Sequence, residues 1–163
     1  MGVTGDDAAP FVRGDGLRLA IVASRFNHAI TEALLEGALA ELDRRGVERS
    51  TVRVAWVPGA LELPLVAQRL ATSGDYDAVI CLGAVVRGET DHHVHVGTQA
   101  AAGVMRVQLD SGVPVSFGVL TTDTEAAAAA RAGGERGNRG ADAAAAAVET
   151  ADLLGRLPKG FVG

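Results

Sequence analysis

Cysteine is almost absent from this chain, since Cys81 is the only one in 163 residues. A single cysteine excludes a disulfide framework and a paired-thiol metal site within one chain. Cys81 lies in an apolar run, so we expect a small buried core residue. No apolar stretch is long enough to span a membrane, and residues 1–7 lack the basic and apolar regions of a secretion signal. These absences predict a cytoplasmic protein with no membrane partner.

Common nucleotide and hydrolase motifs are missing as well. No G-x-G-x-x-G follows the first apolar run, and G-x-x-x-x-G-K-[ST], H-E-x-x-H and G-x-S-x-G do not occur. His92 and His95 are three residues apart on an expected helix, a spacing that suits a shared metal, but no third ligand follows at a characteristic distance. The sequence therefore predicts no metal site.

Charge of one sign does not dominate the chain. Fifteen Lys and Arg against twenty Asp and Glu give a net charge of -5, and the basic residues are scattered. This argues against a nucleic-acid partner, because such surfaces concentrate basic residues. A small phosphorylated ligand needs only one or two cations, so that class of ligand stays open.

Four short apolar runs, rich in β-branched residues, predict strands buried on both faces, at 17–23, 51–57, 77–83 and 113–120. Helical patterns separate them, at 28–45, about 59–72 and 90–110. In the last of these helices Val94, Gly97, Ala101 and Val104 are expected to form one face. Strands that alternate with helices predict right-handed crossovers. The expected fold is a flavodoxin-like three-layer α/β/α domain with a four-stranded parallel sheet and helices on both faces.

The C-terminal third is typical of two further helices. Thr122 and Glu125 have the spacing of a capping box, which predicts a helix from there to about Ala132. Four glycines then break the chain before a last helix that ends at about Gly155: Gly133, Gly134, Gly137 and Gly140. The alanine runs are interpreted as helix, because alanine is the best helix former.

We divide the chain into an N-terminal arm (1–16), one α/β domain (17–157) and a loose tail (158–163). Pro10, Phe11 and Val12 are able to add a strand to a sheet edge. A four-stranded open sheet has two uncovered edges, so we expect an oligomer that covers them.

Polar and glycine-rich segments follow all four predicted strands, at 24–27, 57–62, 87–92 and 118–122. The carboxyl ends of parallel strands share one rim, where ligands of open α/β sheets bind. Gly88 to Thr90 precede a helix whose first turn offers free N–H groups to an anion, and a histidine there can move protons near neutral pH. From the residues alone, a phosphorylated small molecule is the expected ligand.

Five ordered motifs carry a resemblance to a known family: S-R-F-N at 24–27, V-P-G-A-L-E-L-P at 57–64, G-A-V-V-R-G-E-T at 83–90, F-G-V-L-T-T at 117–122, and R-A-G followed by G-N-R-G within 131–140. With them the chain, from Leu17 to Leu154, resembles lumazine synthases. These enzymes make 6,7-dimethyl-8-ribityllumazine in riboflavin biosynthesis. The resemblance implies two substrates, a ribitylaminopyrimidinedione and 3,4-dihydroxy-2-butanone 4-phosphate, and no cofactor.

The resemblance also implies the site residues. His92 transfers protons, and Phe26 stacks on the pyrimidine ring while Asn27 starts the next helix. Glu62 and backbone groups of Gly59, Ala60 and Leu61 hold the ribityl hydroxyls. The remaining implied substrate contacts are Val85, Val86, Gly88, Glu89, Thr90, Phe117, Arg131 and Arg139. Gly88, Glu89 and Thr90 face the phosphate, Arg131 completes its charge, and Phe117 and Arg139 come from an adjoining subunit.

The chain departs from this family around the histidine cluster. His93, Val94 and His95 stand where relatives carry an aromatic residue, Asp and Tyr. We expect His93 and His95 to be helix-face or subunit-contact residues. The departure keeps a second interpretation open, a non-catalytic flavin- or lumazine-binding shell, and a third is an unrelated phosphate-ligand binder. The resemblance further implies pentamers, and the short 133–140 linker is the form that goes with a sixty-subunit icosahedral shell.

Overall fold

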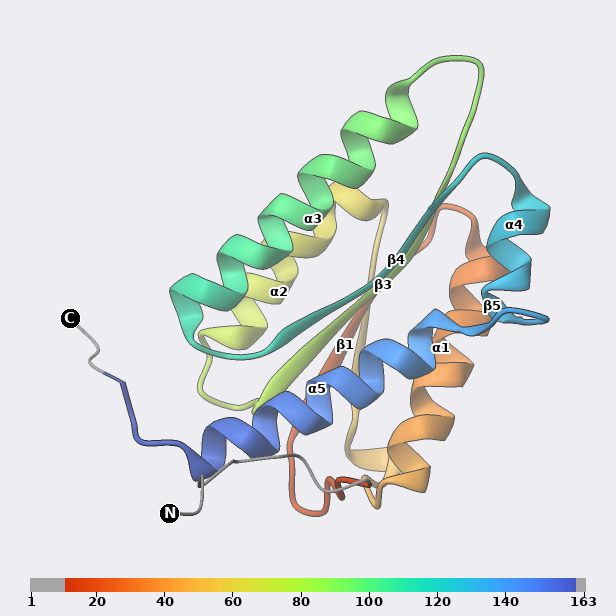
Figure 1. Ribbon diagram of the computed structural model, residues 1–163. Helices are drawn as coiled ribbons and strands as arrows, with labels where there is room; N and C mark the ends of the chain where they lie inside the picture. Colours follow the sequence, from red (N-terminus) through yellow and green to blue (C-terminus); the bar gives the residue numbers. More distant parts are fainter. Residues whose placement is uncertain (1–10, 161–163) are drawn as a thin grey trace, which may run out of the picture.

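The computed structural model describes residues 11–160 as a three-layer α/β/α fold (Figure 1). Four parallel strands form the sheet in the order β2-β1-β3-β4: β1 (Leu19–Ser24), β2 (Arg53–Val57), β3 (Ala78–Val86) and β4 (Val115–Thr122). Strands β1 and β3 are central and almost wholly buried, whereas β2 and β4 are edges with partly exposed side chains. The flavodoxin-like expectation is confirmed, and burial on both faces holds for the two central strands.

Helices cover both faces of this sheet. One face carries α1 (His28–Arg44) and α5 (Arg139–Arg156), and the other carries α2 (Leu63–Ala71) and α3 (His92–Ser111). Each pair closes its own apolar core against the sheet, with Ile21 and Ile80 in the first core and Val22 and Cys81 in the second. The core position of Cys81 is confirmed, and burial raises the pKa of its thiol to about 12. The thiol therefore stays protonated near neutral pH, which excludes Cys81 as a nucleophile.

Several predicted helix boundaries differ from those in the structure, because short 3-10 turns and the end of β4 occupy residues that were expected to be helical. The segment at 59–62 is not yet α-helix: Ala60–Glu62 forms the 3-10 turn η2 before α2, and a similar turn η1 (Arg49–Thr51) precedes β2. The capping box at Thr122 is wrong, because Thr122 ends β4. The N-cap is Thr124, whose Oγ1 accepts a hydrogen bond from the Ala127 N–H at 3.0 Å. Helix α4 (Glu125–Ala130) ends two residues before the predicted Ala132.

The glycine-rich linker is an ordered hairpin between β5 (Ala132–Gly134) and β6 (Gly137–Asn138). Gly133 and Gly137 have φ angles of 101° and 77°, which other residues rarely adopt. Gly140 does not break the chain as expected but lies in the first turn of α5, where its N–H donates to the Asn138 side chain at 2.8 Å. The Nδ2 of the same Asn138 donates to Ala33 O at 3.0 Å, and this hydrogen bond holds the linker against α1.

The predicted extra strand at Pro10–Val12 is not formed in its described part. Phe11 and Val12 have no strand geometry, and Pro10 lies outside the described residues. The Phe11 ring instead lies under the guanidinium groups of Arg44 and Arg45, and Arg45 Nη1 donates to Val12 O at 3.0 Å. Residues 158–160 carry no regular structure, and within residues 11–160 no helix has the length and apolar character needed to cross a membrane.

Candidate functional site

Loops from neighbouring strands meet at the carboxyl edge of the sheet. Backbone hydrogen bonds link the loop after β1 to that after β2, from Arg25 N to Val57 O at 2.8 Å and from Phe26 N to Pro58 O at 3.1 Å. Arg87 N donates to Thr122 O at 2.9 Å and joins the ends of β3 and β4 in the same way. The parallel topology thus brings together segments up to about a hundred residues apart in sequence.

A cavity of about 540 Å³ opens between these loops, and we name it the Phe26 cavity. Ten of the residues expected at the site line it: Phe26, Gly59, Ala60, Leu61, Glu62, Val85, Val86, Gly88, Thr90 and His92. Pro58, Ala84, His93 and Val96 complete its wall and were not predicted. Cavities of this size suit a small ligand that is held by apolar walls and a few polar groups.

Asn27 positions Phe26 rather than lining the cavity. It adopts the left-handed conformation, with φ 56° and ψ 49°, and its Nδ2 donates to Ala84 O at 2.8 Å. Asparagine tolerates this region better than most residues, which explains its place between β1 and α1. The sharp turn leaves the Phe26 ring 73% exposed at the cavity mouth, where an aromatic face is free to stack on a flat ligand.

Glu62 is oriented by the backbone of its own loop. Its Oε2 accepts a hydrogen bond from the Gly59 N–H at 2.9 Å, and Pro64 follows in the first turn of α2, where its lack of an N–H costs nothing. One carboxylate accepts several hydrogen bonds. The remaining lone pairs of Glu62 are therefore available to hydroxyl groups of a ligand.

His92 is the first residue of α3, which begins two residues later than the predicted start at 90, and its side chain is exposed. The backbone N–H of His92 donates to Thr90 Oγ1 at 3.3 Å, and this hydrogen bond fixes the loop that carries Gly88. The N-terminus of this twenty-residue helix favours an anion in the loop, because the helix dipole and unpaired N–H groups point there. Glu89 lies in the same loop but does not line the cavity.

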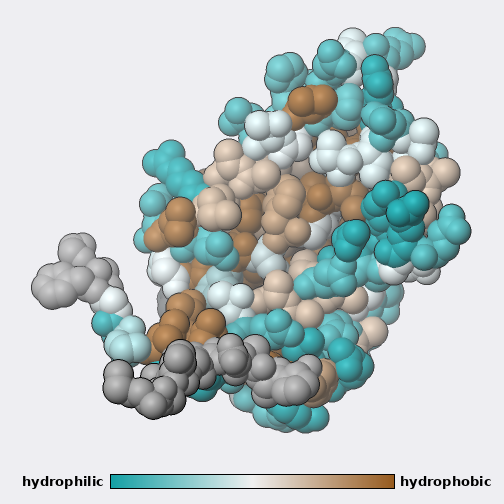
Figure 2. Space-filling model, in the orientation of Figure 1, coloured by the Kyte–Doolittle hydropathy of each residue, from teal (hydrophilic) through white to brown (hydrophobic). Residues whose placement is uncertain are grey.

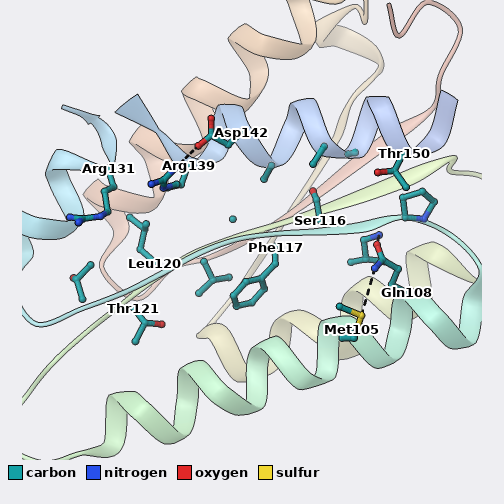
Figure 3. A pocket seen from close by; sticks show the side chains of 18 of the residues that line it. Met105, Gln108, Ser116, Phe117, Leu120, Thr121, Arg131, Arg139, Asp142 and Thr150 are labelled. Atoms are coloured by element: carbon teal, nitrogen blue, oxygen red, sulfur yellow. Dashed lines mark hydrogen bonds and ion pairs between the residues drawn. The ribbon is translucent and has the colours of Figure 1, made fainter. Parts of the chain in front are cut away.

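Three expected residues lie elsewhere, in a cavity of about 800 Å³ along the outer edge of β4. This β4 cavity contains Phe117, Arg131 and Arg139, and Figure 3 shows Phe117 pointing toward α3 while the two arginines lie on the opposite side. Arg131 Nη1 donates to Ala127 O at 2.9 Å, and Arg139 Nη1 contacts Asp142 Oδ2 at 2.8 Å. Figure 2 shows apolar side chains in this region between α3 and α5. Within one chain, the two arginines therefore do not reach the Phe26 cavity.

His93 was expected to be a helix-face or subunit-contact residue. Within one chain it lies on the buried face of α3, is only 8% exposed and lines both the Phe26 cavity and the β4 cavity. The buried face of α3 is His93, Gly97, Ala100, Val104 and Val107, whereas Val94 and Ala101 are exposed. The i, i+4, i+7 spacing of these residues is the signal that identifies His93, and it was missed because histidine is polar. His95 is exposed as expected.

The described part of the chain contains no set of side chains suited to bind a metal ion. Within residues 11–160, no group of three or more His, Cys, Asp or Glu side chains is arranged to hold a metal ion.

The fold and the cavity together define a small-molecule enzyme of the flavodoxin-like α/β class, with an imidazole and a carboxylate at the carboxyl edge of the sheet. The sequence profile described as 6,7-dimethyl-8-ribityllumazine synthase matches residues 16–155. The chain belongs to the 6,7-dimethyl-8-ribityllumazine synthase family, and the resemblance found in the sequence is confirmed.

Individual relatives agree with this assignment. A 6,7-dimethyl-8-ribityllumazine synthase of Protochlamydia amoebophila is 51% identical over 140 residues, which cover 86% of this chain and 81% of the relative. The proteins of that name from two Coxiella burnetii strains, CbuG_Q212 and RSA 493, are each 56% identical over 137 residues, or 84% of this chain and 91% of theirs.

Proposed function

We propose that this protein condenses 5-amino-6-(D-ribitylamino)uracil with 3,4-dihydroxy-2-butanone 4-phosphate to 6,7-dimethyl-8-ribityllumazine, with release of phosphate and water. The observation that carries the proposal is the family match over residues 16–155 together with the Phe26 cavity. That cavity combines an aromatic face, a carboxylate, a glycine-containing loop at a helix start and an imidazole. These are the groups that a flat heterocycle, a polyol chain, a phosphate and a proton transfer each require.

The exposed ring of Phe26 stacks on the pyrimidinedione, and its polyol chain extends toward Glu62 and the backbone of Gly59 to Leu61. Val85 and Val86, at the end of β3, form the apolar wall opposite. The hydrogen bond from Gly59 to Glu62 supports this arrangement, because it holds the carboxylate at the cavity wall before the ligand arrives.

The phosphate lies against Gly88 to Thr90 at the start of α3. The reaction begins with attack of the substrate amine on the ketone, continues through loss of water to an imine and elimination of phosphate, and ends with ring closure and loss of a second water. Each step moves a proton, and His92 serves as the base in its neutral form and as the acid in its protonated form. No step needs a redox partner or an electron sink, so we assign no cofactor.

An adjoining copy of the chain completes the site. Phe117, Arg131 and Arg139 line the β4 cavity instead of the Phe26 cavity, which is the arrangement expected if the β4 cavity of one subunit closes over the Phe26 cavity of the next. The uncovered edges β2 and β4 support such an assembly. We propose pentamers that assemble into a sixty-subunit shell in the cytoplasm.

A direct assay tests the reaction. Purified protein given both substrates should produce the absorbance of the lumazine product faster than the spontaneous background. A rate equal to the background would overturn the synthase proposal, and retained riboflavin binding in that case would indicate a non-catalytic flavin- or lumazine-binding shell. Light scattering measures the mass of the assembly, and a monomer would contradict the shared site.

A further inference from the structure

Asn138 lies where three elements of the fold meet. It is the last residue of β6 and the N-cap of α5, and α1 passes beside it. Its Oδ1 accepts hydrogen bonds from the N–H groups of Gly140, at 2.8 Å, and Ala141, at 3.1 Å, while its Nδ2 donates to Ala33 O at 3.0 Å. One side chain therefore joins the hairpin, the start of α5 and α1.

Close packing leaves this side chain little freedom to move. An added Cβ at Gly37 of α1 would overlap the Asn138 amide, and an added Cβ at Gly140 would lie 2.9 Å from its Oδ1. On the facing strand β5, an added Cβ at Gly133 would lie 3.5 Å from its Nδ2. An amide suits this position because it both donates and accepts hydrogen bonds, whereas a carboxylate only accepts them.

Two arginines of the β4 cavity are attached to this junction. Arg139 follows Asn138 directly as the first residue of α5, and its backbone N–H donates to Arg131 O at 2.8 Å across the hairpin. Ala132 and Asn138 form the next pair of the same ladder. Figure 3 shows both arginine side chains on the same side of the β4 cavity. The hairpin therefore fixes the spacing of the two arginine backbones, and Asn138 fixes their place relative to α1.

This arrangement suits a phosphate group. Arg139 Nη1 contacts Asp142 Oδ2 at 2.8 Å, and this contact uses only part of a guanidinium group that has five N–H donors. The remaining donors can bind phosphate oxygens, and Arg131 supplies a second planar fork. Charge-assisted hydrogen bonds are short, so a shift of the arginine backbone weakens them. Asn138 lines neither cavity and acts only through the residues that it holds.

We propose that Asn138 is a positioning residue that holds Arg139, and with it Arg131, where the phosphate of the butanone substrate binds. This inference rests on the proposed function and adds the residue that aligns the two cations. It also gives the hairpin at 132–138 a role in phosphate recognition. Asn138 acts in the subunit that supplies the β4 cavity, and its effect falls on the Phe26 cavity of the next subunit.

Asn138→Leu tests the inference, because leucine has nearly the same shape and makes none of the three hydrogen bonds. We expect the KM for butanone phosphate to rise roughly tenfold, as weaker charge-assisted hydrogen bonds require, while the KM for the pyrimidinedione changes less than about twofold. Val148→Ala is the matched control, since it removes core packing from the same helix and lines neither cavity. It should lower the thermal stability and leave both KM values unchanged.

Mixed assemblies show which cavity the substitution damages. Co-expression of Asn138→Leu with His92→Ala should raise activity above the residual rate of either variant, because some sites then combine an intact His92 with an intact β4 cavity. Co-expression with Arg139→Ala should give no such gain, since both changes damage the β4 cavity. Where Arg139→Ala and His92→Ala restore each other, the opposite pattern for Asn138→Leu would overturn the inference.

Asn138→Ser covers poor folding of Asn138→Leu, because serine still caps α5 but is too short to reach Ala33 O. Its KM for butanone phosphate should rise several-fold. An unchanged KM in either folded variant would overturn the inference. Equal rises for both substrates, or the same rise in Val148→Ala, would also overturn it, because they indicate a general disturbance. A wild-type protein that makes no lumazine overturns the proposed function instead.

Discussion

Val85 and Thr121 are direct neighbours across the β3–β4 ladder, yet they line different cavities. Val85 belongs to the wall of the Phe26 cavity, and Thr121 belongs to the β4 cavity. The two cavities therefore meet along the last residues of one strand pair, with His93 of α3 lining both. If the β4 cavity of one subunit closes over the Phe26 cavity of the next, the boundary between the two cavities of each chain lies between two active sites.

Replacing His92 should slow the reaction without abolishing it. We expect His92→Ala to lower kcat by roughly tenfold to hundredfold, near the low end for general acid–base catalysis, because the substrate phosphate can itself accept a proton. Steady-state kinetics at saturating substrates measure this, with His95→Ala as the control on the exposed face of α3. A kcat equal to that of the wild type would remove His92 from the proton transfers.

Two impaired variants should regain activity, above the residual rate of either one alone, when they assemble together. His92→Ala damages the Phe26 cavity, and Arg139→Ala damages the β4 cavity. In an equal mixture, about one quarter of shared sites would combine an intact His92 with an intact Arg139 of the neighbour. Co-expression followed by the lumazine assay measures the recovery. If both residues served one site within a chain, every site would carry a defect and no activity would return.

Arg131 should act mainly on one substrate. We expect Arg131→Ala to raise the KM for butanone phosphate by roughly tenfold to hundredfold, as the loss of a charge-assisted hydrogen bond requires, and to leave the KM for the pyrimidinedione nearly unchanged. Arg136→Ala is the control, since Arg136 is exposed in the adjacent hairpin and does not line the cavity. Similar KM values for Arg131→Ala and the control would contradict a phosphate contact.

Gly140 should tolerate no side chain. A Cβ at this position would collide with the backbone carbonyl of Leu34, where α5 packs on α1, and a backbone atom cannot easily give way. We expect Gly140→Ala to lower stability by roughly 1–3 kcal/mol. Gly155→Ala, in open space near the end of the same helix, should instead gain about 0.5–1 kcal/mol. Thermal unfolding at one fixed protein concentration compares them, and equal shifts would contradict the contact.

The ion pairs of Glu41 with Arg44 and Arg45 should make stability depend on acid pH. Hydrogen bonds from Arg44, at 2.8 Å, and from Arg45, at 2.7 Å, hold the pKa of Glu41 below its ordinary value of 4.5. Because the folded-state pKa is lowered, this stabilisation is present above pH 4.5 and is lost as pH falls through the folded-state pKa.

Glu41→Gln should therefore cost about 1–3 kcal/mol near neutral pH, and the difference from the wild type should shrink below pH 4.5. Glu36→Gln, in an exposed pair with Arg49, should cost less than about 1 kcal/mol. Unfolding curves from about pH 3 to pH 7 measure the two differences. A constant difference for Glu41→Gln across that range would contradict the ionic origin.

Local pattern was enough to locate the strands and the loops that follow them, but it could not orient every helix. Helix α3 has apolar residues around much of its circumference, among them Val94, Val96 and Ala101. Neighbouring residues lie about 100° apart around a helix. The predicted face and the buried face share Gly97 and Val104, but Val94 and Ala101 were predicted where His93 and Ala100 are buried. Packing against the sheet makes this choice, and the local pattern does not contain it.

The predicted N-cap of α4 was wrong for a related reason. Thr122 and Thr124 both precede alanines at a spacing that suits a cap, and Thr122 is used by β4, whose ladder with β3 extends to the Val86–Thr122 pair. The strand ends two residues later than predicted, at Thr122, and this moves the helix start by two residues. Pairing with β3 is non-local, so the segment 122–132 alone does not reveal it.

The sequence by itself determined the order of strands and helices, the carboxyl-edge loops, the family and the position of His92 at a helix start, because these depend on local periodicity and motifs. Only the tertiary structure decided that Phe117, Arg131 and Arg139 stand apart from the Phe26 cavity, and that the buried His93 lines both cavities. The physical reason is the sheet order β2-β1-β3-β4, which makes β4 an open edge. The β4 cavity lies along that edge, apart from the Phe26 cavity, which the loops after β1, β2 and β3 line.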